Sequence, residues 1–132
     1  MKLLRIALLG LLGCLTIASS AFAFAQADAE PETVLVRYHV QAGKQPEMEA
    51  LIRKQWAALR RLDVVEEQPH VVLRGTEDGG KPVFVEVFTW RTADAPDHLP
   101  AEIQTLWSAM NKAVESRGGR AGIDIRAMTP VQ

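Results

Sequence analysis

Cysteine is almost absent from this sequence of 132 residues: the one thiol is Cys14, in an apolar stretch near the N-terminus. If that stretch is removed, the remaining chain can form no disulfide, carries no thiol nucleophile and offers no thiolate to a metal. A chain without disulfides must be stabilised by its own core or by a partner. Because "LLGC" is similar to a bacterial lipoprotein box, lipidation at Cys14 is an alternative, although the apolar segment continues past the cysteine.

Blocks of basic residues are also absent. The chain has 15 Lys and Arg residues against 16 Asp and Glu residues. Without Lys2 and Arg5, 13 basic residues face 16 acidic ones, which gives a net charge of −3. Proteins that bind nucleic acid usually carry a basic patch or run, so this balance argues against a nucleic-acid partner. Repeats and low-complexity segments are absent too, and about 105 residues beyond the N-terminal stretch are enough for one domain.

The N-terminal segment has the layout of a secretory signal. Lys2 and Arg5 precede an apolar run over residues 6–18, and small residues follow. The run is shorter than the roughly 20 residues of a membrane-spanning helix, which favours a cleaved signal over the alternative, a permanent anchor. We therefore expect a bacterial Sec-type signal and a periplasmic or secreted protein, with membrane contact only through this segment before cleavage.

The cleavage position stays open among overlapping small-x-small patterns, which place it after Ala23, Ala25 or Ala27. We take residues 1–25 as the signal peptide. Residues 26–32 then form a flexible, polar lead-in, and residues 33–132 form the domain.

The periodicity of apolar residues predicts four strands and two helices. Alternation with many β-branched side chains is typical of strands, and apolar steps of three and four residues indicate amphipathic helices. The expected order is a strand at 33–41, a helix at 46–62, a hairpin of strands at 70–75 and 83–90, a helix at 101–117, and a strand around 123–127. Residues 94–100 are expected to be irregular or to hold one helical turn, and "RGGRAG" to cap the second helix.

This β-α-β-β-α-β order predicts an α+β, ferredoxin-like fold with a four-stranded antiparallel sheet and two helices on one face. The aliphatic sets are expected to face the helices: Val34, Val36, Val40, Val83, Val85, Val87, Ile123 and Ile125. The other face then holds Leu35, Arg37, His39, Val72, Phe84, Glu86, Phe88, Trp90 and Met128. Because three large aromatic side chains are too much apolar area for a small monomer to leave in water, we expect a homodimer through this face, with an Arg37–Glu86 ion pair inside it.

The stretches "VLVRYHVQAGK" and "VFVEVFTWRTADAPDHL", with "LW" in the helix that follows, resemble the dimeric α+β barrel superfamily. Within it, the resemblance is to proteins with an antibiotic biosynthesis monooxygenase-like (ABM-like) domain, over about residues 33–128. It implies a pocket between helices and sheet in each subunit. Carried over to this chain, the pocket would be lined by Tyr38, His98, Trp107 and Met110, and Trp56 would close it.

The activity that the resemblance implies is cofactor-independent monooxygenation of a small phenolic or quinol compound. His98 would take the phenolic proton, so that oxygen attacks an electron-rich anion, and Tyr38 would orient the substrate. Each residue also has a structural interpretation: His98 packs at the start of the second helix, Trp56 and Trp107 belong to the core, and the Tyr38 hydroxyl bonds to His98, water or a ligand. For the whole protein, the alternative is a non-enzymatic ligand-binding or structural homodimer.

Haem and metal chemistry have little support in the sequence. The haem-degrading members of the superfamily carry an asparagine on the first strand, where this chain has Val36, and a helix histidine where it reads "WSAMN". Met110 is a poor substitute as a sole axial ligand. A metal pair of His39 and His70 lacks a third ligand in any recognisable motif. We therefore expect neither a cofactor nor a metal.

Overall fold

The computed structural model describes residues 30–131. The elements, in chain order, are β1 (Glu32–His39), α2 (Gln45–Arg61), β2 (Val65–Glu77), the 3-10 turn η1 (Asp78–Gly80), β3 (Lys81–Trp90), the 3-10 turn η2 (Ala95–His98), α3 (Ala101–Ala113) and β4 (Ile123–Met128). The expected signal peptide, its three cleavage positions, Cys14 and most of the lead-in lie outside the described residues. Within residues 30–131, no helix is long and apolar enough to cross a membrane.

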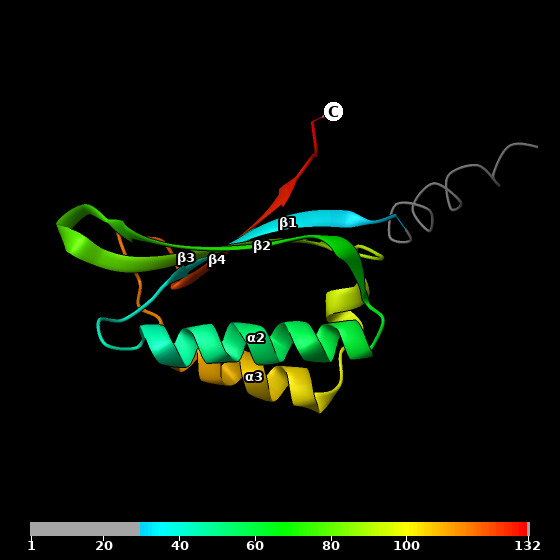
Figure 1. Ribbon diagram of the computed structural model, residues 1–132, viewed down its shortest axis with the longest axis horizontal. Coiled ribbons are helices and arrows are strands. Elements are labelled where there is room, and N and C mark those ends of the chain that lie inside the picture. The colour runs from blue at the N-terminus through cyan, green and yellow to red at the C-terminus, as the bar shows by residue number, and fades with distance from the viewer. Residues whose placement is uncertain (1–29, 132) are drawn as a thin grey trace, which may run out of the picture.

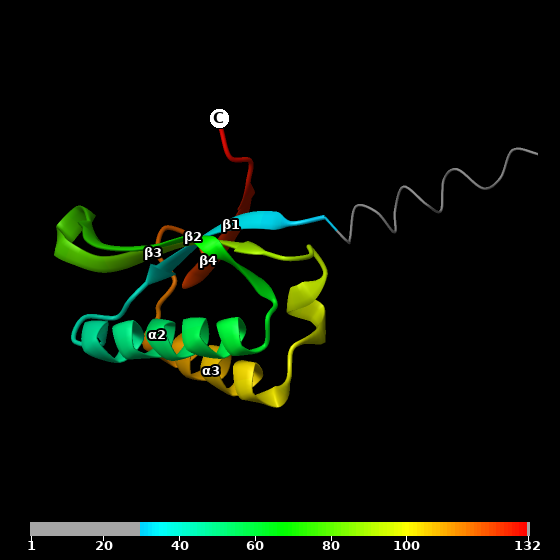
Figure 2. The same cartoon turned by 45° about the vertical axis from the view of Figure 1, so that its right-hand side comes forward.

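The four strands form one antiparallel sheet in the order β2-β3-β1-β4. Both helices lie on the same side of this sheet, and the C-terminal end of the chain rises from the opposite side (Figure 1 and Figure 2). The predicted ferredoxin-like α+β fold is therefore confirmed. The second strand is longer than predicted, since β2 begins at Val65 and has a register shift between Val65 and His70.

α2 forms where the sequence combines helical spacing of apolar residues with favourable charges at both ends. Pro46 lies in the first turn with Glu47, and the last turn carries Arg60 and Arg61, as the helix dipole favours. The buried residues of α2 are Met48, Ile52, Gln55, Ala58 and Leu59. Gln55 is the exception among them, because it brings a polar amide into an otherwise apolar interface.

The strand register places the aromatic side of β3, rather than its valine side, against the helices. Val34 lies opposite Phe88, and Val36 lies opposite Glu86, so these side chains share one face. The most deeply buried residues of β3 are Phe84, Glu86, Phe88 and Trp90, each at most 5% exposed. Val83, Val85 and Val87 are on the other face, so their predicted orientation is wrong. The large rings fill the space between sheet and helices and bury more apolar area there than valines would.

The face away from the helices carries a group of aliphatic side chains. Leu35, Val85 and Val87 are half-buried on it. Its most open apolar residues are Val71, Leu73 and Met128, which are 44%, 60% and 48% exposed. Arg37 also lies on this face, opposite Asp124 in the register, whereas Glu86 points to the helices. The predicted Arg37–Glu86 ion pair is therefore wrong, although the second face of the sheet is apolar as expected.

The second helix was predicted to end at Arg117, but α3 ends at Ala113. Val114 is extended and forms an isolated bridge with Val40. The side-chain amide of Gln41 donates to the backbone oxygens of Lys112 at 3.1 Å and Val114 at 2.8 Å. The chain that follows β1 thus bonds the carbonyls at the end of α3, and the helix stops there.

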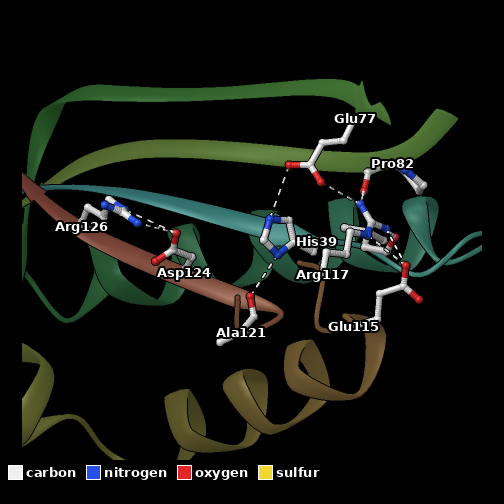
Figure 3. A network of polar contacts seen from close by, with 9 residues as sticks. His39, Glu77, Pro82, Glu115, Arg117, Ala121, Asp124 and Arg126 are labelled. Atoms are coloured by element: carbon white, nitrogen blue, oxygen red, sulfur yellow. Dashed lines mark hydrogen bonds and ion pairs between the residues drawn. The ribbon is translucent and has the colours of Figure 1, made fainter. Parts of the chain in front are cut away.

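Arg117 ties the end of β1 to the β2–β3 hairpin (Figure 3). Its side chain is only 8% exposed. It contacts the carbonyl oxygens of Val40 (2.6 Å) and Pro82 (2.7 Å) and the carboxylates of Glu77 (3.4 Å) and Glu115 (2.9 Å). Gly118 and Gly119 have positive φ in the turn from Arg117 to Arg120, so they reverse the chain instead of capping α3.

His39 belongs to the same network and is buried at 2% exposure. Its Nδ1 lies 3.0 Å from the carbonyl oxygen of Ala121, and its Nε2 lies 3.5 Å from Glu77 (Figure 3). His39 therefore has a structural setting on the outer side of the sheet.

Candidate functional site

A cavity of about 270 Å³ lies between the sheet and the two helices. We call it the α3 cavity; its lining residues are Val34, Val36, Tyr38, Gln55, Phe88, Trp90, Trp107, Met110, Asn111, Ile123 and Ile125. Its volume is just below the roughly 300–1,000 Å³ of typical small-molecule pockets. Mostly apolar and aromatic walls with a few polar groups are the usual composition of such pockets, so the cavity suits a small aromatic molecule.

Glu86 is the polar centre behind this cavity, and its side chain is fully buried. Its Oε2 accepts a hydrogen bond from the Tyr38 hydroxyl at 2.7 Å and one from Gln55 Nε2 at 3.3 Å. Its Oε1 lies 3.1 Å from His70 Nε2. A buried carboxylate is costly unless it is paired and hydrogen-bonded, and these three contacts, from β1, α2 and β2, supply that compensation.

Tyr38 is held in its neutral form by this environment. Burial raises the pKa of the Tyr38 hydroxyl well above its ordinary value, and the adjacent Glu86 charge and the hydrogen bond to it raise the pKa further. A hydrogen bond to a carboxylate favours the protonated phenol because ionisation would place two negative charges side by side. The hydroxyl therefore donates to Glu86 at neutral pH.

Gln55 links the two helices to Glu86. Trp107 Nε1 on α3 donates to Gln55 Oε1 at 2.7 Å, and this contact fixes the direction of the amide, so that its nitrogen points to Glu86. The indole of Trp107 is thereby held at the wall of the α3 cavity. The buried polar groups form one connected and satisfied network, which is the arrangement that rigidifies a core.

A second hollow, of about 580 Å³, lies between α2 and the β2–β3 hairpin. We call it the α2 groove; its lining residues are Glu49, Ile52, Arg53, Trp56, Ala57, His70, Val72, Arg74 and Phe84. Inside it, the rings of Trp56 and His70 are stacked with centroids 3.6 Å apart and an interplanar angle of 8°. The stack aims His70 at Glu86 from the side opposite the α3 cavity.

Comparison with known proteins supports the fold. No family model matches the sequence, and the search of curated proteins gave no match. Among solved structures, a point variant of SnoaB, a cofactor-independent oxygenase from Streptomyces nogalater, is 19% identical with a TM-score of 0.57, covering 79% of this chain and 96% of that one. A candidate antibiotic biosynthesis monooxygenase from Caulobacter crescentus is 15% identical with a TM-score of 0.56, covering 84% of this chain and 99% of that one. This chain has the ABM-like α+β barrel fold.

A further candidate antibiotic biosynthesis monooxygenase, from Bacteroides thetaiotaomicron, is 12% identical with a TM-score of 0.58 over 78% of this chain and 91% of that one. The resemblance drawn from the strand and helix motifs is thus confirmed for the fold. At these identities the ABM-like fold alone is shared, and the chemistry has to be argued from the residues of this chain.

The ABM-like fold brings three of the five predicted site residues together. Tyr38, Trp107 and Met110 all line the α3 cavity. Trp56 lines the α2 groove instead, where it packs on His70. His98 lies on η2 with its side chain 72% exposed, 3.5 Å from Asp94, and is not among the lining residues of the α3 cavity. The partner of the Tyr38 hydroxyl is Glu86.

Gln55, Glu86 and His70 were not predicted as site residues of this ABM-like fold. Glu86 was expected in a dimer interface, because the alternation within β3 reveals two faces but not which one the helices cover. A carboxylate between two phenylalanines was the available signal. Gln55 stands at a helical position of the apolar stripe, and that exception to the pattern was a second signal.

The ABM-like fold also separates the two strand histidines. His39 lies opposite Val83 on the outer side of the sheet, and His70 lies opposite Phe88 on the helix side, so they cannot share one metal ion. Among residues 30–131, no cluster of three or more His, Cys, Asp or Glu side chains is arranged to hold a metal.

Proposed function

We propose that this protein binds a small phenolic or quinol compound in the α3 cavity and oxidises it with molecular oxygen, without a cofactor. The observation that carries the proposal is the 2.7 Å hydrogen bond from Tyr38 to the fully buried Glu86 at the wall of an aromatic cavity. The shared fold adds support, since SnoaB is described as a cofactor-independent oxygenase.

The walls of the α3 cavity suit a flat ring. Phe88 and Trp90 pack edge to face with centroids 5.0 Å apart, and Trp107 is held by its bond to Gln55. Rings fixed in this way offer stacking and edge contacts to an aromatic ligand. Asn111 also lines the cavity and adds an exposed amide that can bond to a ring substituent.

Removal of the phenolic proton is the first requirement, because oxygen attacks the electron-rich phenolate. The Tyr38 oxygen accepts the substrate proton while the Tyr38 proton moves to Glu86 Oε2. Tyr38 stays neutral throughout, in keeping with its raised pKa, and the negative charge passes from Glu86 to the substrate. In this scheme the Tyr38–Glu86 pair takes the role of base that the resemblance implied for His98.

The oxidation balances without a further reductant. A phenol with a free para hydrogen and one O₂ give a para-quinone and one water: the para carbon is oxidised from C–H to C=O, and O₂ accepts four electrons. One oxygen atom remains in the quinone, and the other leaves as water with the phenolic and para hydrogens. The proton held on Glu86 returns through Tyr38 to the departing oxygen.

Ligand binding without reaction is the second candidate function, and one observation favours it. Glu86 already accepts hydrogen bonds from Tyr38 and Gln55 and lies within bonding distance of His70. These three contacts already engage both oxygens of the Glu86 carboxylate. The same cavity then holds the phenol without deprotonating it.

Oxygen uptake with a panel of phenols and hydroquinones tests the proposal. We expect Tyr38→Phe and Glu86→Gln to lower kcat by about 10²–10⁴-fold, the usual contribution of general acid–base catalysis. Glu102→Gln is the matched control, because Glu102 is exposed and pairs only with Arg61. His98→Ala decides between the two assignments of the base: a loss of uptake there would return the role to His98.

Binding is measured separately by quenching of tryptophan fluorescence, since Trp90 and Trp107 line the cavity. Saturable quenching without oxygen uptake would support the binding protein and contradict the oxygenase. Absence of both would contradict both functions for these compounds.

Export and a homodimer through the outer face of the sheet complete the proposal. The basic start, apolar run and small-x-small exit of residues 1–25 support export. The exposed Val71, Leu73 and Met128 support the homodimer, because exposed apolar side chains on a sheet face are typical of an association surface.

A further inference from the structure

The two oxygens of the Glu86 carboxylate belong to different sides of the protein. Oε2 accepts from Tyr38 and Gln55, both of which line the α3 cavity. Oε1 is bonded to His70, which lines the α2 groove. The carboxylate therefore connects two hollows that no other side-chain hydrogen bond among residues 30–131 joins.

His70 is the point where this connection meets solvent. Its side chain is 19% exposed, whereas that of Glu86 is 0% exposed. Within residues 30–131, no group bonds its second ring nitrogen, Nδ1, and every buried side-chain nitrogen or oxygen has a partner. Nδ1 is therefore open to water in the α2 groove. The stack on Trp56 holds the His70 ring in an orientation in which Nε2 faces Glu86 and Nδ1 faces the groove.

We propose that His70 is a proton-relay residue, which connects Glu86, and through it Tyr38, to water in the α2 groove. Its use in catalysis rests on the proposed function, since the proton that enters at Tyr38 is the substrate's. Imidazole suits the task because it can accept at one nitrogen and release from the other near neutral pH.

The transfer is charge-balanced. When His70 is protonated, its Nε2–H donates to Oε1 of the Glu86 carboxylate. A proton that arrives at Oε2 from Tyr38 neutralises Glu86, and the His70–Glu86 pair then carries one positive charge. His70 discharges it by losing the Nδ1 proton to groove water, and the reverse steps return a proton when product water forms.

Other charges face His70 from the elements around it. Glu49 and Arg53 on α2 and Arg74 on β2 line the same groove. Glu49 pairs with both arginines, at 2.7 Å from Arg53 and 3.8 Å from Arg74. The groove mouth thus carries a partly compensated positive charge.

Exchange of the Tyr38 hydroxyl proton with water tests the relay without any substrate. Tyr38 is the only tyrosine of the chain, so its hydroxyl resonance can be assigned by NMR through its loss in Tyr38→Phe. A proton that leaves Tyr38 reaches solvent either through Glu86 and His70 or through the α3 cavity. We expect His70→Gln, which keeps a donor for Glu86 Oε1 but cannot relay, to slow this exchange at least tenfold.

His98→Gln is the matched control, because it makes the same change at an exposed histidine and is expected to leave the exchange rate unchanged. An unaltered exchange rate in folded His70→Gln would overturn the relay. If the exchange depends on His70 while no phenol is oxidised, the relay stands and the oxygenase proposal fails. If His70→Gln does not fold, the wild type can be carbethoxylated at His70 Nδ1, and peptide mass spectrometry locates the modification. This modification must then slow exchange of the Tyr38 hydroxyl proton at least tenfold.

Discussion

Tyr38 and Glu86 are diagonal neighbours on adjacent strands. In the register of β1 and β3, Tyr38 stands opposite Phe84, and Glu86 stands opposite Val36, yet the Tyr38 hydroxyl reaches Glu86 Oε2 at 2.7 Å. Diagonal positions on one face of an antiparallel pair are within reach of long aromatic side chains. The pair therefore depends on the pairing of β1 with β3, and a shift of one residue would move Glu86 to the outer face.

Loss of the Tyr38 hydroxyl should destabilise the protein at neutral pH. Tyr38→Phe removes a hydrogen bond to a buried carboxylate, and such bonds contribute about 1.5–3 kcal/mol. We expect the free energy of unfolding, measured in urea at pH 7, to fall by this amount. An unchanged midpoint would show that Gln55 and His70 satisfy Glu86 without Tyr38.

The stabilising effect of Tyr38 should vanish in alkali. The folded-state pKa of Tyr38 is raised above the unfolded value of about 10. Above pH 10 the unfolded chain loses its phenolic proton while the folded protein keeps it, so the free energy of unfolding falls as pH rises. Urea titrations between pH 9 and 11 should show this decline in the wild type and not in Tyr38→Phe. A parallel decline in both proteins would assign it to other groups.

Arg117 should contribute strongly to stability. Arg117→Met removes the guanidinium that contacts two backbone carbonyls and two carboxylates, and we expect a loss of about 2–4 kcal/mol in unfolding free energy. Arg126→Met is the control, because Arg126 is 63% exposed and pairs only with Asp124 (Figure 3). Exposed pairs contribute about 0–1 kcal/mol. Equal midpoints for the two variants in urea would contradict the anchoring role of Arg117.

The outer face of the sheet should be a self-association surface. Leu73 is 60% exposed there, and Leu73→Lys places a charge in the proposed interface, so light scattering at micromolar concentration should give a lower mass than the wild type. Val72→Lys is the control on the same strand, because Val72 points to the α2 groove. A monomeric wild type, or dissociation by both variants alike, would refute the proposed surface.

The N-terminal residue of the processed chain should show whether the proposed signal peptide is removed. Intact-mass measurement of the chain from a periplasmic fraction is expected to give a first residue of Phe24, Gln26 or Asp28, which follow the three cleavage positions. A diacylated chain that begins at Cys14 would establish lipidation, and an intact N-terminus in the membrane fraction would establish an anchor.

The periodicities of the sequence determined the order of elements and hence the ferredoxin-like fold. The steps of three and four residues from Met48 to Leu59 specify α2, and the alternations along β1 and β3 specify strands whichever face is buried. Three of the predicted site residues, Tyr38, Trp107 and Met110, could be placed together because the fold alone brings β1 and α3 to one cavity.

What the sequence could not decide is which side of β3 meets the helices, because both sides are apolar and period-two alternation is symmetric between them. Only the packing of Phe84, Phe88 and Trp90 under the helices resolves this choice, since rings of that size fill the interlayer space and valines do not. That choice places Glu86 under the helices as a buried carboxylate, rather than in the expected dimer interface. Tyr38, Gln55 and His70, from three separate elements, all contact Glu86 as a result. No local pattern in the sequence predicts these contacts.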